Sequence, residues 1–239
     1  MEPGMATIKQ TPGGGYLGRM TIRRIWAASG AVAIVLFGCG LLFGDLLGSS
    51  NYPPLNASYA RLRTYFLHNG SEVRALGFFH LLSAVALLCF IAYLHDRFRD
   101  AGQPRGPLPA ITLAGGVVAA AFLLCSALVY RTLAEPAVVR DPALTHALVI
   151  LSYLAGGPAI AAPLALPVAA GAILALRRVL LPRWTGWLGT AAVAASLLSA
   201  TTLLGPMNNT SVTYAILLLA AVLALLWTFI ASILLAAAR

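Results

Sequence analysis

The chain has 239 residues, of which 60% are hydrophobic and only 10% are charged, and its mean hydropathy is +0.86. Soluble domains carry about 25% charged residues, so this composition excludes an ordinary soluble protein and predicts a surface that faces a lipid bilayer. The formal net charge is +9, but the basic residues lie at the ends of apolar runs. Arginine at such positions anchors helices and sets their orientation, so the charge does not indicate a nucleic-acid partner.

Residues 1–24 are polar and rich in glycine, and they end in Arg19, Arg23 and Arg24. We interpret this segment as a disordered, basic cytoplasmic tail. The apolar run that follows is too long for the core of a secretory signal peptide, which argues against an export signal. Residues 25–239 are predicted to form a single bundle of transmembrane helices.

Six apolar runs predict an all-α, polytopic membrane protein, because each run is long enough to cross a hydrocarbon core of about 30 Å. The predicted spans lie at about residues 25–48, 75–95, 110–130, 143–176, 184–204 and 212–238. A short amphipathic segment after Ser58, which ends at Asn69, predicts an additional helix between the first two spans. We expect this helix to lie on the membrane surface.

The fourth run, residues 143–176, contains no Asp, Glu, Lys or Arg but does contain Gly156, Gly157 and three prolines. In a bilayer, neighbouring helices can satisfy the backbone groups that such a break frees, so we interpret the run as one kinked span. Six crossings then place eleven of the sixteen Lys and Arg residues on the side of the two termini. By the positive-inside rule, both termini are predicted to be cytoplasmic. Dividing the fourth run into two crossings would remove this charge asymmetry.

Gly40, Gly44 and Gly48 recur at every fourth position of the first span. Such a face of small residues lets another helix approach closely. The pattern is equally compatible with a dimer and with packing inside the bundle.

Ionisable residues inside apolar spans are the default indication of a functional site in a membrane protein. Asp45, His80 and His146 share a similar predicted depth near the outer ends of their helices, while His146, Tyr153 and Gly157 share one helix face. These five residues are the candidate ligand-binding set. They could relay protons, hold a polar head group or bind a metal. However, no span carries two histidines at ligand spacing, so no metal site is predicted and no cofactor is identified.

An alternative interpretation is that each of these side chains only reaches the outer interface or bonds to a loop. Likewise, Gly157 begins a stripe of small residues, so the break serves either helix packing or a transport site near the midplane. The sequence contains no Walker motif, dinucleotide fingerprint or nucleophile signature.

Three segments carry a resemblance to a known family: residues 65–74 (YFLHNGSEVR), residues 95–99 (HDRFR) and residues 176–189 (LRRVLLPRWTGWLG). Their order along the chain resembles that of the six-helix integral membrane proteins of unknown function that are abundant in actinobacteria. This domain-of-unknown-function family implies the six-span fold and its topology, and it implies no activity.

We therefore expect a multi-pass protein of the bacterial cytoplasmic membrane that acts as a non-catalytic accessory or interaction subunit. One alternative is a small transporter or lipophilic-ligand binder with a pocket open to the outer face. Another is an intramembrane enzyme that acts on a lipid or isoprenoid. The lipid bilayer is the predicted partner in every case, with a membrane protein or a second copy as a further possibility.

Overall fold

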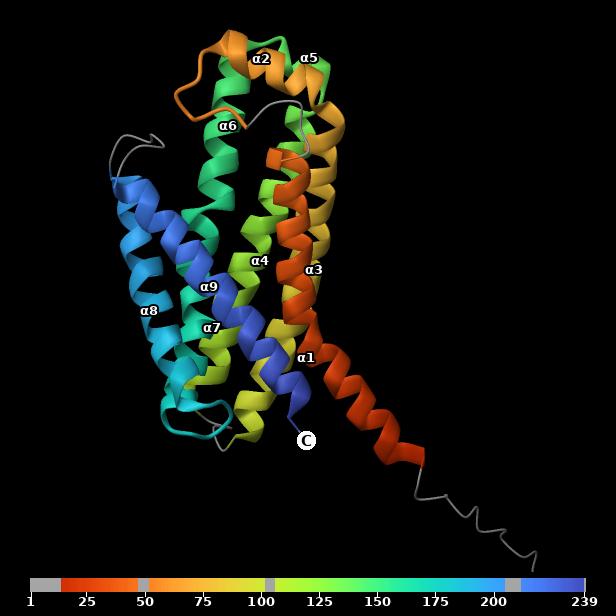
Figure 1. Ribbon diagram of the computed structural model, residues 1–239, viewed down its shortest axis with the longest axis vertical. Helices are drawn as coiled ribbons and strands as arrows, with labels where there is room; N and C mark the ends of the chain where they lie inside the picture. Colours follow the sequence, from red (N-terminus) through yellow and green to blue (C-terminus); the bar gives the residue numbers. More distant parts are fainter. Residues whose placement is uncertain (1–13, 47–51, 102–105, 205–211, 239) are drawn as a thin grey trace, which may run out of the picture.

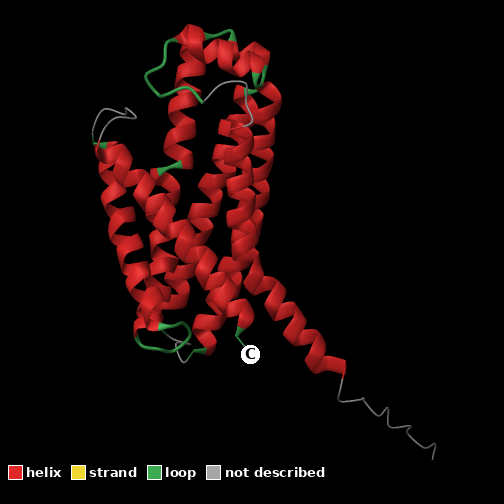
Figure 2. Cartoon of the chain, in the orientation of Figure 1, coloured by secondary structure: helices red, strands yellow, loops and turns green. Residues whose placement is uncertain are grey.

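The computed structural model describes residues 14–46, 52–101, 106–204 and 212–238. Within these ranges the chain forms helices joined by short loops and contains no strand (Figure 2). In the described residues, six helical segments are long and apolar enough to cross a membrane. The prediction of an all-α, multi-pass membrane fold is therefore confirmed.

The six crossings are made by α1 (Gly14–Leu41), α3 (Gly70–Asp100), α4 (Pro107–Leu133), α6 (Pro142–Gly156) with α7 (Pro158–Leu176), α8 (Arg183–Ser199) and α9 (Val212–Ala237). A π-helical turn, Leu42–Leu46, continues α1, and a 3-10 turn, Ala200–Leu203, continues α8. The short helices α2 (Tyr59–His68) and α5 (Pro136–Val139) lie across one end of the bundle (Figure 1). We call this end the capped end.

At the opposite end of the bundle, α3 and α7 end and α8 begins (Figure 1). We call it the basic end, because it carries several exposed arginines. They are Arg23, Arg24, Arg99, Arg177, Arg178 and Arg183. Exposed Trp184 and Trp187 at the start of α8 lie near the same end. Tryptophan and arginine at the ends of apolar helices mark the membrane–water interface, so the basic end lies at one interface of the bilayer.

Helix α1 begins at Gly14, so residues 14–24 are helical where the sequence predicts a disordered tail; residues 1–13 lie outside the described range. Ile22, Ile25 and Trp26 recur at i, i+3 and i+4, a spacing that favours a helix with one apolar face. Every residue from 21 to 26 is exposed. We call residues 14–26 the arm of α1, and this arm projects from the bundle at the basic end (Figure 1).

A serine from the last helix accounts for the bend between the arm and the rest of α1. The Ser232 hydroxyl accepts a hydrogen bond from the Ala31 amide at 2.8 Å and donates one to the Ala27 carbonyl at 2.6 Å. Ala27 and Ala31 are the i−4 and i partners of one helical hydrogen bond, so a side chain from α9 enters the ladder of α1. Insertion into the ladder is an established cause of helix kinks.

Trp227 of α9 is the largest fully buried side chain among the described residues, with 1% of its surface exposed, and it packs against α7 and α8. A Cβ built on Gly171 of α7 would lie 2.5 Å from Trp227 Cζ2, and one on Gly189 of α8 would lie 2.8 Å from its indole nitrogen. The indole N–H donates to the Thr185 carbonyl at 3.0 Å. The two glycines therefore create the space for the ring, and its polar atom is satisfied.

The glycine face of α1 packs inside the bundle. A Cβ on Gly40 would lie 3.1 Å from His80, and one on Gly44 would lie 3.0 Å from Leu76, both on α3. Gly48 lies outside the described residues. Close packing of α1 on α3 therefore explains the described part of this stripe.

The amphipathic helix predicted after Ser58 is present as α2, but its apolar face does not lie on the membrane. Leu62, Tyr65 and Phe66 are buried together with residues of α3, α4 and α5. Burial against the end of the bundle removes the same apolar surface from water as a bilayer would. The helix is therefore a cap on the protein.

We expect Gly171→Ala to lower the melting temperature of the purified protein, because the added methyl group meets the Trp227 ring inside a packed core. Overpacking of this kind costs about 1–3 kcal/mol. Gly38→Ala is the matched control, since no atom lies within 4 Å of its Cβ position. Equal melting temperatures for the two variants in the same detergent would contradict the described packing of Trp227.

We expect Ser232→Ala to change the direction of the arm. The arm from Gly14 to Trp26 is about 20 Å long, so relaxing a kink of about 20° moves its tip by roughly 7 Å. The distance between spin labels at Ile22 and Val179, measured by electron–electron resonance in a cysteine-free background, reports this change. Thr228→Ala is the control because its hydroxyl bonds only within α9, to the Ala224 carbonyl at 2.8 Å. Identical distance distributions for both variants would show that Ser232 does not set the bend.

Candidate functional site

The break in the fourth span lies at Gly157, between α6 and α7, as the sequence predicts. Gly157 has φ −111° and ψ −103°, and a Cβ there would lie 2.7 Å from the Tyr153 carbonyl. The next residue, Pro158, has no amide hydrogen, while the amides of Ile160 and Ala161 bond to the Gly157 carbonyl at 3.1 and 3.0 Å. Residue 157 therefore has to be glycine, and α7 starts as a properly initiated helix.

His80 is buried in α3 with 2% of its surface exposed. Its ring stacks on Phe37 of α1 with centroids 4.7 Å apart, and it meets the Tyr130 ring edge-on at 5.6 Å. Neither ring nitrogen has a hydrogen-bonding partner among the described residues. A neutral imidazole carries one donor and one acceptor, so burial of both without partners is destabilising.

Tyr52, from the loop before α2, connects His80 indirectly to Tyr153, one of the other predicted residues. Its ring meets Tyr130 at 6.3 Å and Tyr153 at 5.9 Å in edge-on contacts. Burial raises the pKa of the Tyr52 phenol, and the neighbouring Tyr130 raises it further, so the phenol stays neutral. We call His80, Tyr130, Tyr52 and Tyr153 the capped-end cluster.

His146 and Tyr153 bind the loop that leads into α2. The Nε2 of His146 lies 3.4 Å from the Ala57 carbonyl, and its Nδ1 lies 3.1 Å from the Pro142 carbonyl. The Tyr153 hydroxyl lies 3.5 Å from the Pro53 carbonyl. These side chains hold the cap in place, which matches the alternative that they bond to a loop.

The predicted set does not share one space in the described residues. His80 is enclosed by rings, whereas His146 bonds to the loop, and Asp45 lies in the π-helical turn with its side chain outside the described residues. Among the described residues, no group of three or more His, Cys, Asp and Glu is arranged to hold a metal ion. Among the described residues, ring contacts through Tyr130 and Tyr52 connect His80 with Tyr153.

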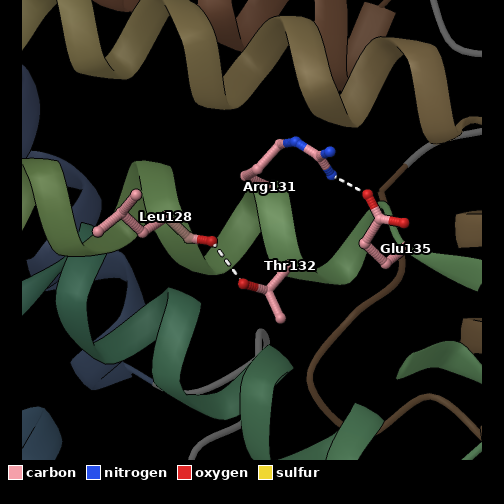
Figure 3. Close-up of polar contacts among 4 residues, drawn as sticks. All are labelled: Leu128, Arg131, Thr132 and Glu135. Carbon is pink, nitrogen blue, oxygen red and sulfur yellow. Dashed lines mark hydrogen bonds and ion pairs between the residues drawn. The ribbon is translucent and has the colours of Figure 1, made fainter. Parts of the chain in front are cut away.

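Further polar contacts fix the cap to the ends of the long helices. The Tyr65 hydroxyl donates to the Gly44 carbonyl at 2.7 Å, and the Tyr59 hydroxyl donates to the Val139 carbonyl at 3.0 Å. At the end of α4, Arg131 pairs with Glu135, while Thr132 donates to the Leu128 carbonyl at 2.9 Å (Figure 3). The capped end is thus closed by bonds that mostly end on backbone carbonyls.

A groove of about 220 Å³ lies at the basic end, between the arm of α1 and the end of α3. Its walls include Arg23, Trp26, Tyr93, Asp96, Arg97 and Asp100. A second, outer opening of about 370 Å³ shares Arg23, Asp96 and Asp100 and adds Arg99. We call the two together the basic-end groove.

The polar groups of the basic-end groove are only weakly engaged with one another. Arg23 and Asp100 approach to 3.6 Å with side chains 66% and 55% exposed, and exposed pairs of this kind contribute about 0–1 kcal/mol. The Nε of Arg97 is buried and has no hydrogen-bonding partner among the described residues. Arg97 also lines the groove, and the planar guanidinium of an arginine is suited to bind a phosphate or carboxylate.

Sequence reasoning assigned the groove residues to other roles. The sequence predicts Arg23 in the cytoplasmic tail and places residues 96–99 just beyond the second span. The sequence does contain a pattern that indicates part of the groove. One face of α3 carries Tyr93, Asp96, Arg97 and Asp100. The missing information was the position of the α1 arm, which depends on Ser232 of α9.

Comparison of the chain with protein-family models, with curated protein sequences and with solved structures finds no match. The resemblance to the actinobacterial six-helix proteins therefore stays a prediction. The function is inferred below from the geometry of the chain itself.

We expect His80→Phe to leave the melting temperature unchanged or to raise it by a few degrees. A phenyl ring keeps the stacking on Phe37 and removes two buried polar atoms whose desolvation costs about 1–3 kcal/mol. His95→Phe is the control: its Nδ1 lies 3.0 Å from the Pro109 carbonyl, so that variant is expected to melt earlier. A lower melting temperature for His80→Phe than for His95→Phe would show that the His80 nitrogens bind a partner.

Proposed function

We propose that this chain is a non-catalytic membrane protein of the accessory type that holds a membrane lipid in the basic-end groove. The observation that carries the proposal is Arg97, which lines the groove and whose buried Nε has no hydrogen-bonding partner among the described residues. The aromatic side chains of Trp26 and Tyr93 also line the groove. Tryptophan and tyrosine side chains, whose rings are apolar and whose polar atom can contact water, are favoured at the level of lipid head groups.

The position of the groove supports a lipid as the occupant. It lies at the bundle end that carries the exposed arginines and tryptophans, and the exposed arm of α1 forms one wall. An amphipathic helix at this level places its apolar face at the boundary between head groups and acyl chains. A lipid could therefore enter from the bilayer without crossing the packed interior.

This proposal moves the ligand-binding alternative to the opposite end of the bundle from the predicted outer-face pocket. The described His80 and His146 side chains have separate surroundings, so they give the transporter and enzyme hypotheses no support. We further propose that the protein lies in the bacterial cytoplasmic membrane. Its basic end then faces the cytoplasm, because arginine accumulates on the cytoplasmic side of membrane proteins. A partner protein would then meet a surface made jointly by the chain and its lipid.

We expect native mass spectrometry of the gently purified full chain to detect a retained phospholipid. Loss of a charge-assisted hydrogen bond costs about 1.5–3 kcal/mol, so Arg97→Gln is expected to reduce retention roughly tenfold. Arg183→Gln is the matched control, because Arg183 is an exposed arginine of the basic end outside the groove. A wild-type protein that carries no lipid, or equal loss in both variants, would refute the proposed function.

A further inference from the structure

Each part of the basic-end groove carries equal numbers of positive and negative side chains, although the two parts together hold three arginines and two aspartates. The inner part contains two arginines, Arg23 and Arg97, and two aspartates, Asp96 and Asp100. The outer opening again has two of each sign, with Arg99 in place of Arg97. A site for a purely anionic lipid would be expected to carry excess positive charge, whereas both compartments match a ligand that carries one charge of each sign.

The groups of the groove also follow a definite order in depth along α3, whose last residue is Asp100. Tyr93 lies deepest, Arg97 lies about 6 Å nearer the end of the helix and Asp100 about 4.5 Å further at 1.5 Å per residue. Side chains on a helix lean towards its N-terminus, so the long Arg97 side chain reaches back into the groove. Tyr93, Arg97 and Asp100 therefore succeed one another from the membrane outwards, and Asp96 lies one residue before Arg97 on the same helix.

We propose that the basic-end groove selects a zwitterionic aminophospholipid, with the phosphate on Arg97 and Arg23 and the primary ammonium on Asp96 and Asp100. The order of groups in such a lipid is acyl chain, phosphate and ammonium, which is the order of Tyr93, Arg97 and Asp100 along α3. This inference rests on the proposed function and adds the identity of the head group.

The primary ammonium is an essential part of the inference. It offers three N–H donors to carboxylate oxygens, whereas the trimethylated ammonium of a choline lipid offers none. The Arg23 and Asp100 side chains are 3.6 Å apart, so an incoming phosphate and ammonium can each take one of these partners without displacing a close hydrogen bond. The phosphate of the head group therefore pairs with Arg23, and its ammonium pairs with Asp100.

The test uses the full chain, delipidated in mild detergent, and three lipids with identical palmitoyl and oleoyl chains: phosphatidylethanolamine, phosphatidylcholine and phosphatidylglycerol. Lipid binding is titrated and read by native mass spectrometry. We expect phosphatidylethanolamine to bind at least fivefold more tightly than either of the others. This comparison uses only the wild-type protein, so it does not depend on the folding of any variant.

The charge-matching step is tested with the double variant Asp96→Asn/Asp100→Asn. Both side chains are exposed on the surface of α3, and the melting temperature checks that the fold is intact. We expect the variant to lose the preference for phosphatidylethanolamine and to bind phosphatidylglycerol more tightly than the wild type does. Asp141→Asn, at the capped end, is the control and is expected to keep the wild-type preference.

The outcomes separate the two proposals. Equal binding of the three lipids, or tighter binding of phosphatidylglycerol by the wild type, would overturn the head-group inference while lipid binding itself stands. Binding of none of them would overturn both. An unchanged preference in the double aspartate variant would also overturn the inference, because the ammonium would then have another partner.

Discussion

A hydroxyl group in the hydrogen-bond ladder of another helix determines much of this architecture. In an apolar medium, a backbone amide or carbonyl that loses its partner is costly, so helices bend only where something replaces the bond. Ser232 can serve both Ala27 and Ala31 at once. The arm of α1 can then diverge from α9 without leaving an unsatisfied backbone group, and the space beside α3 becomes a groove.

The remaining crossings are held by shape more than by polar bonds. Lipid chains are as apolar as leucine side chains, so helix association in a bilayer depends on close packing. Gly171 and Gly189 accommodate Trp227, and Gly40 and Gly44 let α1 approach α3. The packed part of the bundle is therefore specified by glycines opposite bulky residues on other helices, and the groove occurs where α1 leaves that packing.

The sequence predicted the six crossings and the Gly157 break because hydropathy and proline chemistry are local properties. It also predicted the bounds of α2. It did not predict what α2 packs against, because an apolar helix face is equally suited to contact with protein and with lipid. The candidate site was less accessible to prediction. His80 and His146 lie at similar depths, yet their surroundings depend on the Phe37 ring and on the loop at Ala57. The groove requires Arg23 and Asp100 to meet through a bend caused by a residue more than 200 positions from Ala31.

The bonds that close the capped end have a consequence for how the sequence can vary. Tyr59, Tyr65, His146 and Tyr153 all direct their polar atoms at main-chain carbonyls of other segments. A carbonyl is present whatever side chain its residue carries. Substitutions at acceptor positions such as Val139 or Ala57 therefore leave these bonds available, while the four donor positions admit few replacements. Among diverged sequences, only the identity of the donor residue of each bond would be constrained. The donor and acceptor positions would therefore show little covariation, although they are in contact.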